Sequence, residues 1–161
     1  MSAVLDVRSA PVLSDEDRAR AEHYAVLSRL FASAPDAEFL HKLPALAATW
    51  GSSGNALGQA WLMLRDAALS TDAEQLEDEY TRLFLTIGRP DVMLFGSFYM
   101  AGFLMEGPVV ELRADLAELG LGRRFGVTES EDHIAALCDV MRHLIVTGPD
   151  AAGLGRQQLF F

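Results

Sequence analysis

The histidines of the chain are the first candidates for metal binding or acid–base chemistry; they are His23, His41, His133 and His143. None stands in a His-Glu-x-x-His or Glu-x-x-His arrangement, the spacings that place several metal ligands on one helix face. Asp139 and His143 are four residues apart and would share a helix face, but two ligands do not complete a metal site. We interpret them as a surface pair and predict no bound metal.

The residue patterns that bind nucleotides or activate a nucleophile are also missing. A phosphate-binding loop ends in Lys-Ser or Lys-Thr, and the only lysine, Lys42, lies in another context. Gly120, Gly122 and Gly126 follow a predicted helix, whereas the glycines of a dinucleotide site follow a strand. No Gly-x-Ser-x-Gly segment is present. We predict a protein that is not an enzyme and holds no cofactor, while spacing leaves open a site assembled from distant residues.

Two short segments stand out from this background. Residues 131–134, Glu-Asp-His-Ile, place acids and a histidine at the start of an apolar helix. Their structural interpretation is a helix cap with acidic side chains near the positive end of the helix dipole. Residues 96–99, Gly-Ser-Phe-Tyr, end an apolar loop at a point where Ser97 would cap a following helix. Each segment is therefore a candidate for capping or for binding.

The composition is that of one acidic domain. The chain has 161 residues, half of them apolar, which is enough for a single core. Thirteen basic residues against twenty-three acidic ones give a formal net charge of −10. Such a surface repels nucleic acid and suits a basic partner, for example an Arg- and Lys-rich peptide.

The sequence also predicts a cytoplasmic protein. Its single cysteine, Cys138, lies among apolar residues and cannot form an intramolecular disulfide, which indicates a reducing compartment. Residues 1–13 lack the apolar core of a signal peptide, and no stretch reaches the roughly 18 apolar residues of a membrane span. We expect no stable membrane insertion, a flexible N-terminal segment at 1–13 and one helical domain at 14–161.

Apolar residues recur at helical spacing along most of the chain, and no segment alternates with the period of a strand. We therefore predict an all-α bundle of six to seven helices. The predicted helices are one from Ser14 to about Ser33, one from Pro35 that Pro44 disturbs, one after the linker Gly51–Asn55, one from Thr71 through Phe84, one from Pro108 to Leu119, one from Thr128 to Gly148, and a seventh near Asp150.

Local signals predict where several of these helices begin. Ser14 followed by three acidic residues is typical of an N-cap. Thr71 with Glu74, and Thr128 with Glu131, have the spacing of capping boxes. Between the helices, residues 86–98 predict a long apolar loop, a feature that is often functional.

Three segments, taken in order, resemble those of the TorD/DmsD/NarJ-like redox-enzyme maturation chaperones, which are cytoplasmic and all-helical. The family's acid-aromatic-x-x-Leu-Phe helix is similar to Glu79–Phe84. Its Gly-Ser-x-Tyr stretch is similar to Gly96–Tyr99, and its acid-x-Asp-His-Ile stretch to Glu129–Ile134. The resemblance covers roughly Ser14 to Phe161.

This resemblance implies a protein that binds the twin-arginine signal peptide of a molybdoenzyme precursor, or the precursor itself, and holds back export until the cofactor is inserted. An apolar groove would take the hydrophobic part of the signal, while acidic groups pair with its arginines. Asp132 would be the first arginine acceptor. The peptide-binding residues that the resemblance implies are Tyr80, Phe84, Gly96, Ser97, Tyr99, Glu131, Asp132 and His133.

The chain departs from the family at two places. Residues 92–95 read Val-Met-Leu-Phe where relatives usually carry a proline pair, which changes the expected shape of the loop. The chain stops at Phe161 where relatives continue, so we expect a truncated chain, a missing C-terminal helix or completion by another subunit. Some relatives exchange helices, and a domain-swapped homodimer is one such arrangement.

Residues 80–84 and 112–116 look most like members that accompany formate dehydrogenases, which makes that enzyme the preferred client. One alternative is a chaperone that binds a mature cytoplasmic molybdoenzyme subunit without a signal peptide. Another is a small helical nucleotide-binding or enzymatic protein, which the missing phosphate loop disfavours.

Overall fold

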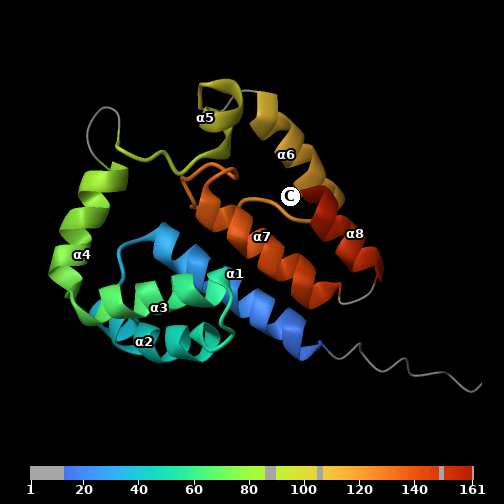
Figure 1. The fold of residues 1–161 in the computed structure, drawn as a ribbon. Helices are drawn as coiled ribbons and strands as arrows, with labels where there is room; N and C mark the ends of the chain where they lie inside the picture. The colour runs from blue at the N-terminus through green and yellow to red at the C-terminus, as the bar shows by residue number, and fades with distance from the viewer. Residues whose placement is uncertain (1–12, 86–89, 105–106, 149–150, 161) are drawn as a thin grey trace, which may run out of the picture.

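The computed structural model describes residues 13–85, 90–104, 107–148 and 151–160, and these fold into helices joined by loops, of which residues 119–133 form a long one (Figure 1). The elements are α1 (Asp15–Ala32), α2 (Ala37–Gly51), α3 (Ala56–Leu69), α4 (Ala73–Tyr80), a π-helical turn η1 (Thr81–Leu85), α5 (Gly96–Ala101), α6 (Gly107–Glu118), α7 (Ile134–Thr147) and α8 (Ala151–Phe160). The described part of the chain contains no β-strand. The prediction of an all-α fold is confirmed, and the described residues form eight α-helices where six to seven were predicted.

Helices α1 and α7 lie side by side and form the centre of the molecule, with α8 packed on α7 (Figure 1). The apolar face of α7 is buried against its neighbours through Cys138, Met141, Leu144 and Ile145. Burial raises the pKa of the Cys138 thiol to about 11, so this cysteine is the inert, buried thiol that the sequence predicts.

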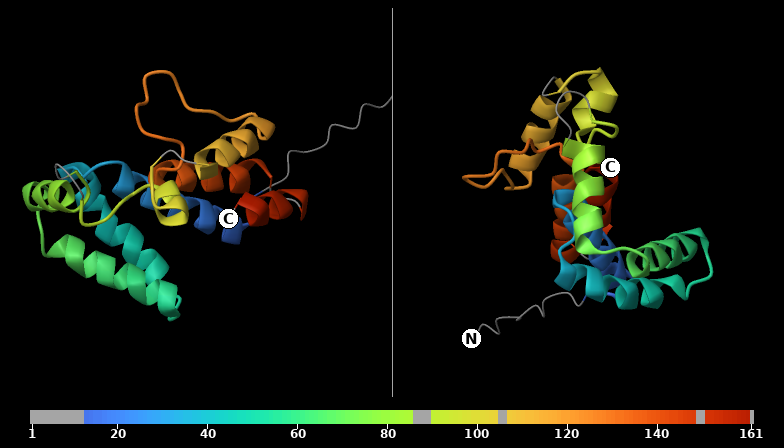
Figure 2. Two further views of the ribbon diagram at one scale, coloured as in Figure 1. Left: turned by 90° about the horizontal axis from the view of Figure 1, so that it is seen from above. Right: turned by 90° about the vertical axis from the view of Figure 1, so that its left-hand side faces the viewer.

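Helices α2 and α3 pair with each other and project sideways from the α1–α7 pair (Figure 2). They bury a second apolar cluster in which Val26 of α1 meets side chains of both helices; its members are Val26, Leu40, Leu43, Ala47, Trp61 and Ala68. α2 continues past Pro44 to Gly51, so the proline does not end this helix. None of the described helices combines the length and the apolar character of a membrane span.

The predicted start of α1 is confirmed and that of α4 is wrong by one residue. The Ser14 hydroxyl accepts a hydrogen bond from the Asp17 N–H at 3.0 Å. In α4 the cap is Asp72 instead of Thr71, because the Asp72 carboxylate accepts from the Gln75 N–H at 2.9 Å. A carboxylate is a better N-cap than a threonine hydroxyl, and the two residues are adjacent.

The predicted capping box of Thr128 and Glu131 is also wrong. α7 begins only at Ile134, and the His133 imidazole caps it by accepting a hydrogen bond from the Ala135 N–H at 3.2 Å. Glu131 instead forms an ion pair with Arg113 of α6 at 2.9 Å. A partner distant in sequence therefore competes successfully with the local cap.

The predicted apolar loop is shorter than expected. Residues 86–89 lie outside the described residues, and so do residues 1–12 of the flexible segment predicted at 1–13. Residues 90–95 are irregular as predicted, but Gly96 already begins α5. The irregular segment is attached to the preceding turn, because the Val92 N–H donates to the Leu83 carbonyl oxygen at 3.1 Å.

Candidate functional site

A cavity of about 820 Å³ lies where the end of α1, the start of α2, α4, η1 and residues 90–95 meet; we call it the α4 cavity. Its apolar lining comes from alanines and from Pro35, Tyr80, Phe84, Leu85, Pro90, Met93, Leu94 and Phe95. Four carboxylate residues also line it, namely Asp36, Glu74, Glu77 and Glu129. No lysine or arginine is among its described lining residues. The cavity therefore combines an apolar wall with negative charge.

Tyr80 and Phe84 form the aromatic wall of the α4 cavity. Their rings meet edge to face with centroids 4.8 Å apart, and Phe84 meets Phe31 of α1 in the same way at 6.2 Å. The Tyr80 hydroxyl donates to the Phe31 carbonyl oxygen at 2.7 Å. Burial, together with the nearby Glu129 carboxylate, raises the pKa of Tyr80, so the hydroxyl stays protonated and keeps this bond.

The backbone that presents Phe84 is unusual. Residues 81–85 wind as a π-helix directly after α4, and Thr81 and Leu85 line the cavity beside Phe84. π-helical turns are rare and frequently occur at functional sites. The π-helical turn therefore supports the interpretation of this cavity wall as part of a functional site.

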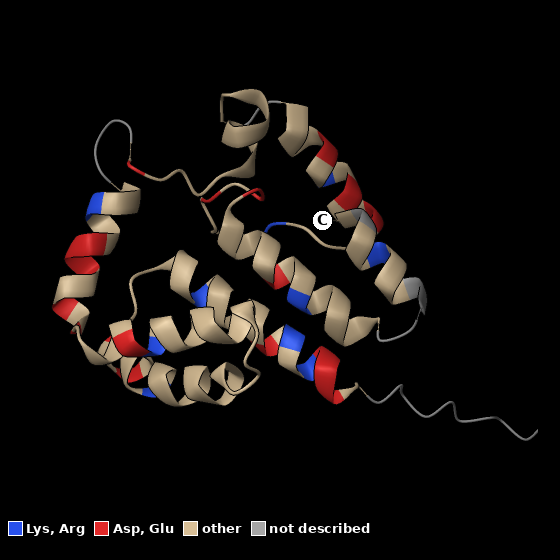
Figure 3. Cartoon of the chain, viewed as in Figure 1, with Lys and Arg blue, Asp and Glu red and all other residues tan. Residues whose placement is uncertain are grey.

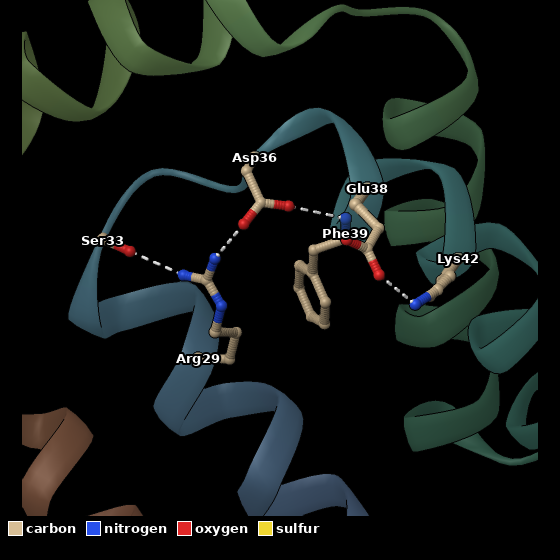
Figure 4. A network of polar contacts seen from close by, with 6 residues as sticks. All are labelled: Arg29, Ser33, Asp36, Glu38, Phe39 and Lys42. Atoms are coloured by element: carbon tan, nitrogen blue, oxygen red, sulfur yellow. Dashed lines mark hydrogen bonds and ion pairs between the residues drawn. The ribbon is translucent and has the colours of Figure 1, made fainter.

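Asp36 stands at the corner between α1 and α2, and its carboxylate is already engaged (Figure 4). It caps α2 by accepting from the Phe39 N–H at 2.8 Å, and it pairs with Arg29 at 2.6 Å. Both contacts hold the pKa of Asp36 below its ordinary value, the Phe39 hydrogen bond most of all. Arg29 also donates to the Ser33 hydroxyl. This carboxylate stabilises the corner and is not available to a ligand.

Glu74 and Glu77 are available. They lie three residues apart on α4 and therefore on one side of it. The helix as a whole is rich in acidic residues (Figure 3). Neither glutamate forms a hydrogen bond or an ion pair with another side chain in the part of the chain that the structure describes. Glu129 lines the same cavity, and its pKa is lowered, chiefly by hydrogen bonding to the backbone. The carboxylates of Glu74 and Glu77 thus have no side-chain partner among the described residues, while the carboxylate of Glu129 already accepts hydrogen bonds from Thr128 and the backbone.

Two segments that are distant in sequence meet behind the cavity. The Gly96 N–H donates to the Asp132 carbonyl oxygen at 3.0 Å, and the Ile134 N–H donates to the Leu94 carbonyl oxygen at 2.8 Å. Phe95 and His133 form an isolated antiparallel bridge, and their rings meet edge to face at 5.1 Å. The structure therefore brings together the two segments that the sequence singled out.

We call the contact between residues 94–97 and 132–134 the junction. The carboxylate of Asp132 is buried there, with only 4% of the residue exposed. Its Oδ2 accepts a hydrogen bond from the Ser97 N–H at 2.8 Å, and Ser97 is 1% exposed. Burial alone would raise the pKa of Asp132. Polar contacts with Ser130 and Ser97 outweigh this effect, so the pKa is lowered overall and the carboxylate is ionised at neutral pH. The predicted role of Asp132 as an arginine acceptor stays a prediction.

The predicted site residues lie in the wall of the α4 cavity, behind it, or, in the case of Tyr99 and Glu131, outside it. Tyr80, Phe84 and His133 line the α4 cavity. Gly96 lies with Ser97 and Asp132 behind it. Tyr99 is 66% exposed and does not line the cavity, although its hydroxyl donates to the carbonyl oxygen of Met93, which does. Glu131 lies outside the cavity and faces Arg113.

Glu74 and Glu77 were missed by the sequence analysis, and so was Glu129 as a cavity residue. The available signal was the run of acids along the helix that precedes Tyr80. That run is also typical of any solvated helix face, so it does not identify a site by itself. The cavity that gives these carboxylates a role forms only when α4 packs near the corner between α1 and α2.

A second cavity, of about 580 Å³, lies on the other side of residues 129–133, between α1, α7 and the end of α6. Its charges are mixed, since Arg123, Arg124 and Arg142 line it together with Glu131 and Asp139. Asp139 and His143 are both exposed there, and the described residues contain no cluster of three metal-ligating side chains. The second cavity therefore lacks the uniform charge of the α4 cavity.

His133, which lines both cavities, predicts a pH dependence of stability. Burial lowers its pKa below the ordinary 6.5, although Glu129 and Asp132 act in the opposite direction. The unfolded chain therefore binds a proton at a higher pH than the folded chain does. Protonation would also turn the capping Nδ1 from an acceptor into a donor. We expect the free energy of unfolding to fall as the pH is lowered below 6.5.

Urea unfolding at pH 7.5, 6.5 and 5.5 measures this effect. His133→Asn keeps a side-chain acceptor at the cap and removes the titrating group, so its stability should fall less over this range. His143→Asn, an exposed position on the same helix, should behave like the unchanged protein. Equal pH dependence in all three proteins would contradict the prediction.

A protein of known structure shares this architecture. The crystal structure of a proposed redox enzyme maturation protein from Archaeoglobus fulgidus is similar to this chain, with a TM-score of 0.58 and 20% identity. The similarity covers 87% of this chain and 90% of that one, and it establishes a common helical fold. No curated protein sequence matches the chain.

The amino-acid sequence also matches a protein family. Residues 52–161, more than half of it, match the family described as the nitrate reductase delta subunit. The chain belongs to this family of redox-enzyme maturation chaperones, which assist redox enzyme subunits and are not catalysts. The matched residues include α4, η1 and both segments of the buried junction.

Proposed function

We propose that this protein is a cytoplasmic chaperone that binds the twin-arginine signal peptide of a molybdoenzyme precursor in the α4 cavity. Binding there holds back export until the cofactor has been inserted into the precursor. The observation that carries the proposal is the lining of the cavity: Glu74, Glu77 and Glu129 line it together with an apolar and aromatic wall, and no lysine or arginine is among its described lining residues.

The two kinds of lining suit the two parts of such a signal peptide. Guanidinium groups form short, charge-assisted hydrogen bonds with carboxylates, and Glu74, Glu77 and Glu129 offer them. The apolar run of the peptide packs on Tyr80 and Phe84, where each buried CH₂ group contributes about 0.8 kcal/mol. The net charge of −10 adds long-range attraction for the basic end of the peptide.

Formate dehydrogenase is the client that we propose first. The support for it is the resemblance of residues 80–84 and 112–116 to chaperones that accompany this enzyme. The first of these segments includes Tyr80 and Phe84, which form the aromatic wall of the α4 cavity.

A calorimetric titration with leader peptides tests the proposal. The peptides are those of molybdoenzymes from the same organism, formate dehydrogenase first, each with a version in which both arginines are alanine. We expect a Kd of about 1 μM or tighter for the native leaders and a loss of at least about tenfold without the arginines. If a folded chain binds no leader but still binds the client after its leader is deleted, the chaperone acts on a mature subunit instead.

A further inference from the structure

Helix α5 has no cap of its own. Phe95 occupies its N-cap position and makes no side-chain hydrogen bond to the first turn. The N–H groups of a first helical turn need acceptors from elsewhere, and here they come from one residue of another segment. Gly96 donates to the Asp132 carbonyl oxygen at 3.0 Å and Ser97 donates to the Asp132 carboxylate at 2.8 Å. Asp132 therefore caps α5 across a gap of 35 residues in the sequence.

The location of Asp132 also argues against direct contact with a peptide. The residue is buried together with Ser97 and Ser130, and it does not line the α4 cavity. A guanidinium group would have to displace the Ser97 N–H or open the junction to reach the carboxylate. Oδ1 of Asp132 and the Ser130 hydroxyl are both buried, and neither has a partner with hydrogen-bond geometry among the described residues.

The two segments that meet at the junction each contribute residues to the wall of the α4 cavity. On one side, Met93, Leu94 and Phe95 line the cavity directly before α5. On the other side, His133 lines it directly before α7. The hydrogen bond from Ile134 to Leu94 completes the attachment at 2.8 Å. Removing the cap would release the start of α5, and residues 93–95 would then lose their fixed position against His133.

We infer that Asp132 is a positioning residue, whose carboxylate caps α5 and thereby fixes residues 93–95 and His133 in the wall of the α4 cavity. The part that concerns peptide binding rests on the proposed function. The part that concerns the cap does not, because it depends only on contacts within the chain. The arginines of the peptide then meet Glu74, Glu77 and Glu129, while Asp132 stays engaged with Ser97.

The test compares Asp132→Asn with Asp132→Ala. Asparagine keeps an oxygen that can accept from the Ser97 N–H, and it is as good an N-cap as aspartate. Its amide can also donate to the buried Ser130 hydroxyl. Alanine removes the acceptor. Glu77→Gln and Glu118→Gln are the matched controls, because each also removes one negative charge, the first inside the cavity and the second at an exposed position of α6 outside it.

Two quantities are measured for each variant: the Kd for a synthetic leader peptide with two adjacent arginines and an apolar run, and the hydrogen-exchange protection of the Ser97 amide by NMR. Asp132→Asn and Glu118→Gln should keep the Kd within about twofold and the amide protected. Glu77→Gln should raise the Kd by about tenfold with the amide still protected. Asp132→Ala should raise the Kd about tenfold and lose the protection, as expected for local opening.

Two results would overturn the inference. If Asp132→Asn weakens binding as much as Glu77→Gln while the Ser97 amide stays protected, the charge of Asp132 contacts the peptide. If Asp132→Ala keeps the amide protected, Asp132 is not the cap. Should Asp132→Ala fail to fold, the asparagine variant decides between charge and cap. A protein that binds no leader at all would refute the proposed function, and the amide measurement would still test the cap.

Discussion

Replacing both Glu74 and Glu77 by lysine should weaken the binding of a twin-arginine leader peptide by at least about hundredfold. Each hydrogen bond to a charged group contributes about 1.5–3 kcal/mol, and two of them are lost. The new lysines add repulsion within a cavity whose described lining contains no basic residue. Isothermal titration calorimetry at two salt concentrations measures the loss, and the remaining affinity should depend less on salt.

The matched control is Asp115→Lys with Glu118→Lys. These two residues are also exposed, also three apart on one helix, and lie on α6 away from the α4 cavity. The control changes the net charge by the same amount, so it should reduce affinity only by the loss of long-range attraction. Glu74 lies in the first turn of α4, where lysine opposes the helix dipole, so circular dichroism must show that α4 remains folded. Equal losses in the two double variants would refute a specific role for α4.

The sequence predicts the helices of this protein well because their signals are local. The apolar stripe of α1 and its Ser14 cap lie within a few residues of each other, and both are present in the structure. The start of α7 is different, because Glu131 pairs with Arg113, which is 18 residues away. No pattern around Thr128 could indicate this competition. Helix boundaries therefore fail where a side chain has a stronger partner in the tertiary structure.

In the candidate site, too, local sequence signals identify the segments but not the tertiary contacts of their side chains. Their residue types alone were enough to single out residues 96–99 and 131–134, which the structure places together through the Gly96–Asp132 hydrogen bond. The motifs do not distinguish a side chain that faces a ligand from one that holds the backbone behind it. Asp132 and Glu77 are both acidic residues near a motif, and only burial and hydrogen bonding separate their roles.

Replacing Tyr80 by alanine should lower the free energy of unfolding by about 3–5 kcal/mol, the range for large aromatic side chains removed from a core. Tyr80 is buried, its ring packs on Phe84, and its hydroxyl bonds to the Phe31 carbonyl oxygen. Tyr80 therefore attaches the end of α4 to the end of α1. Urea unfolding measures the change, and leader affinity should fall with it because the aromatic wall is lost.

Two controls separate packing from the hydrogen bond and from a general effect of losing a tyrosine. Tyr80→Phe keeps the ring and should cost only about 1 kcal/mol, with leader affinity nearly unchanged. Tyr99→Ala removes a tyrosine that is also hydrogen-bonded to a carbonyl oxygen but is mostly exposed, and it should cost no more than about 1 kcal/mol. A Tyr80→Ala variant as stable as Tyr99→Ala would contradict the attachment of α4 through Tyr80. In that case the position of Glu74 and Glu77 beside the aromatic wall would need another support.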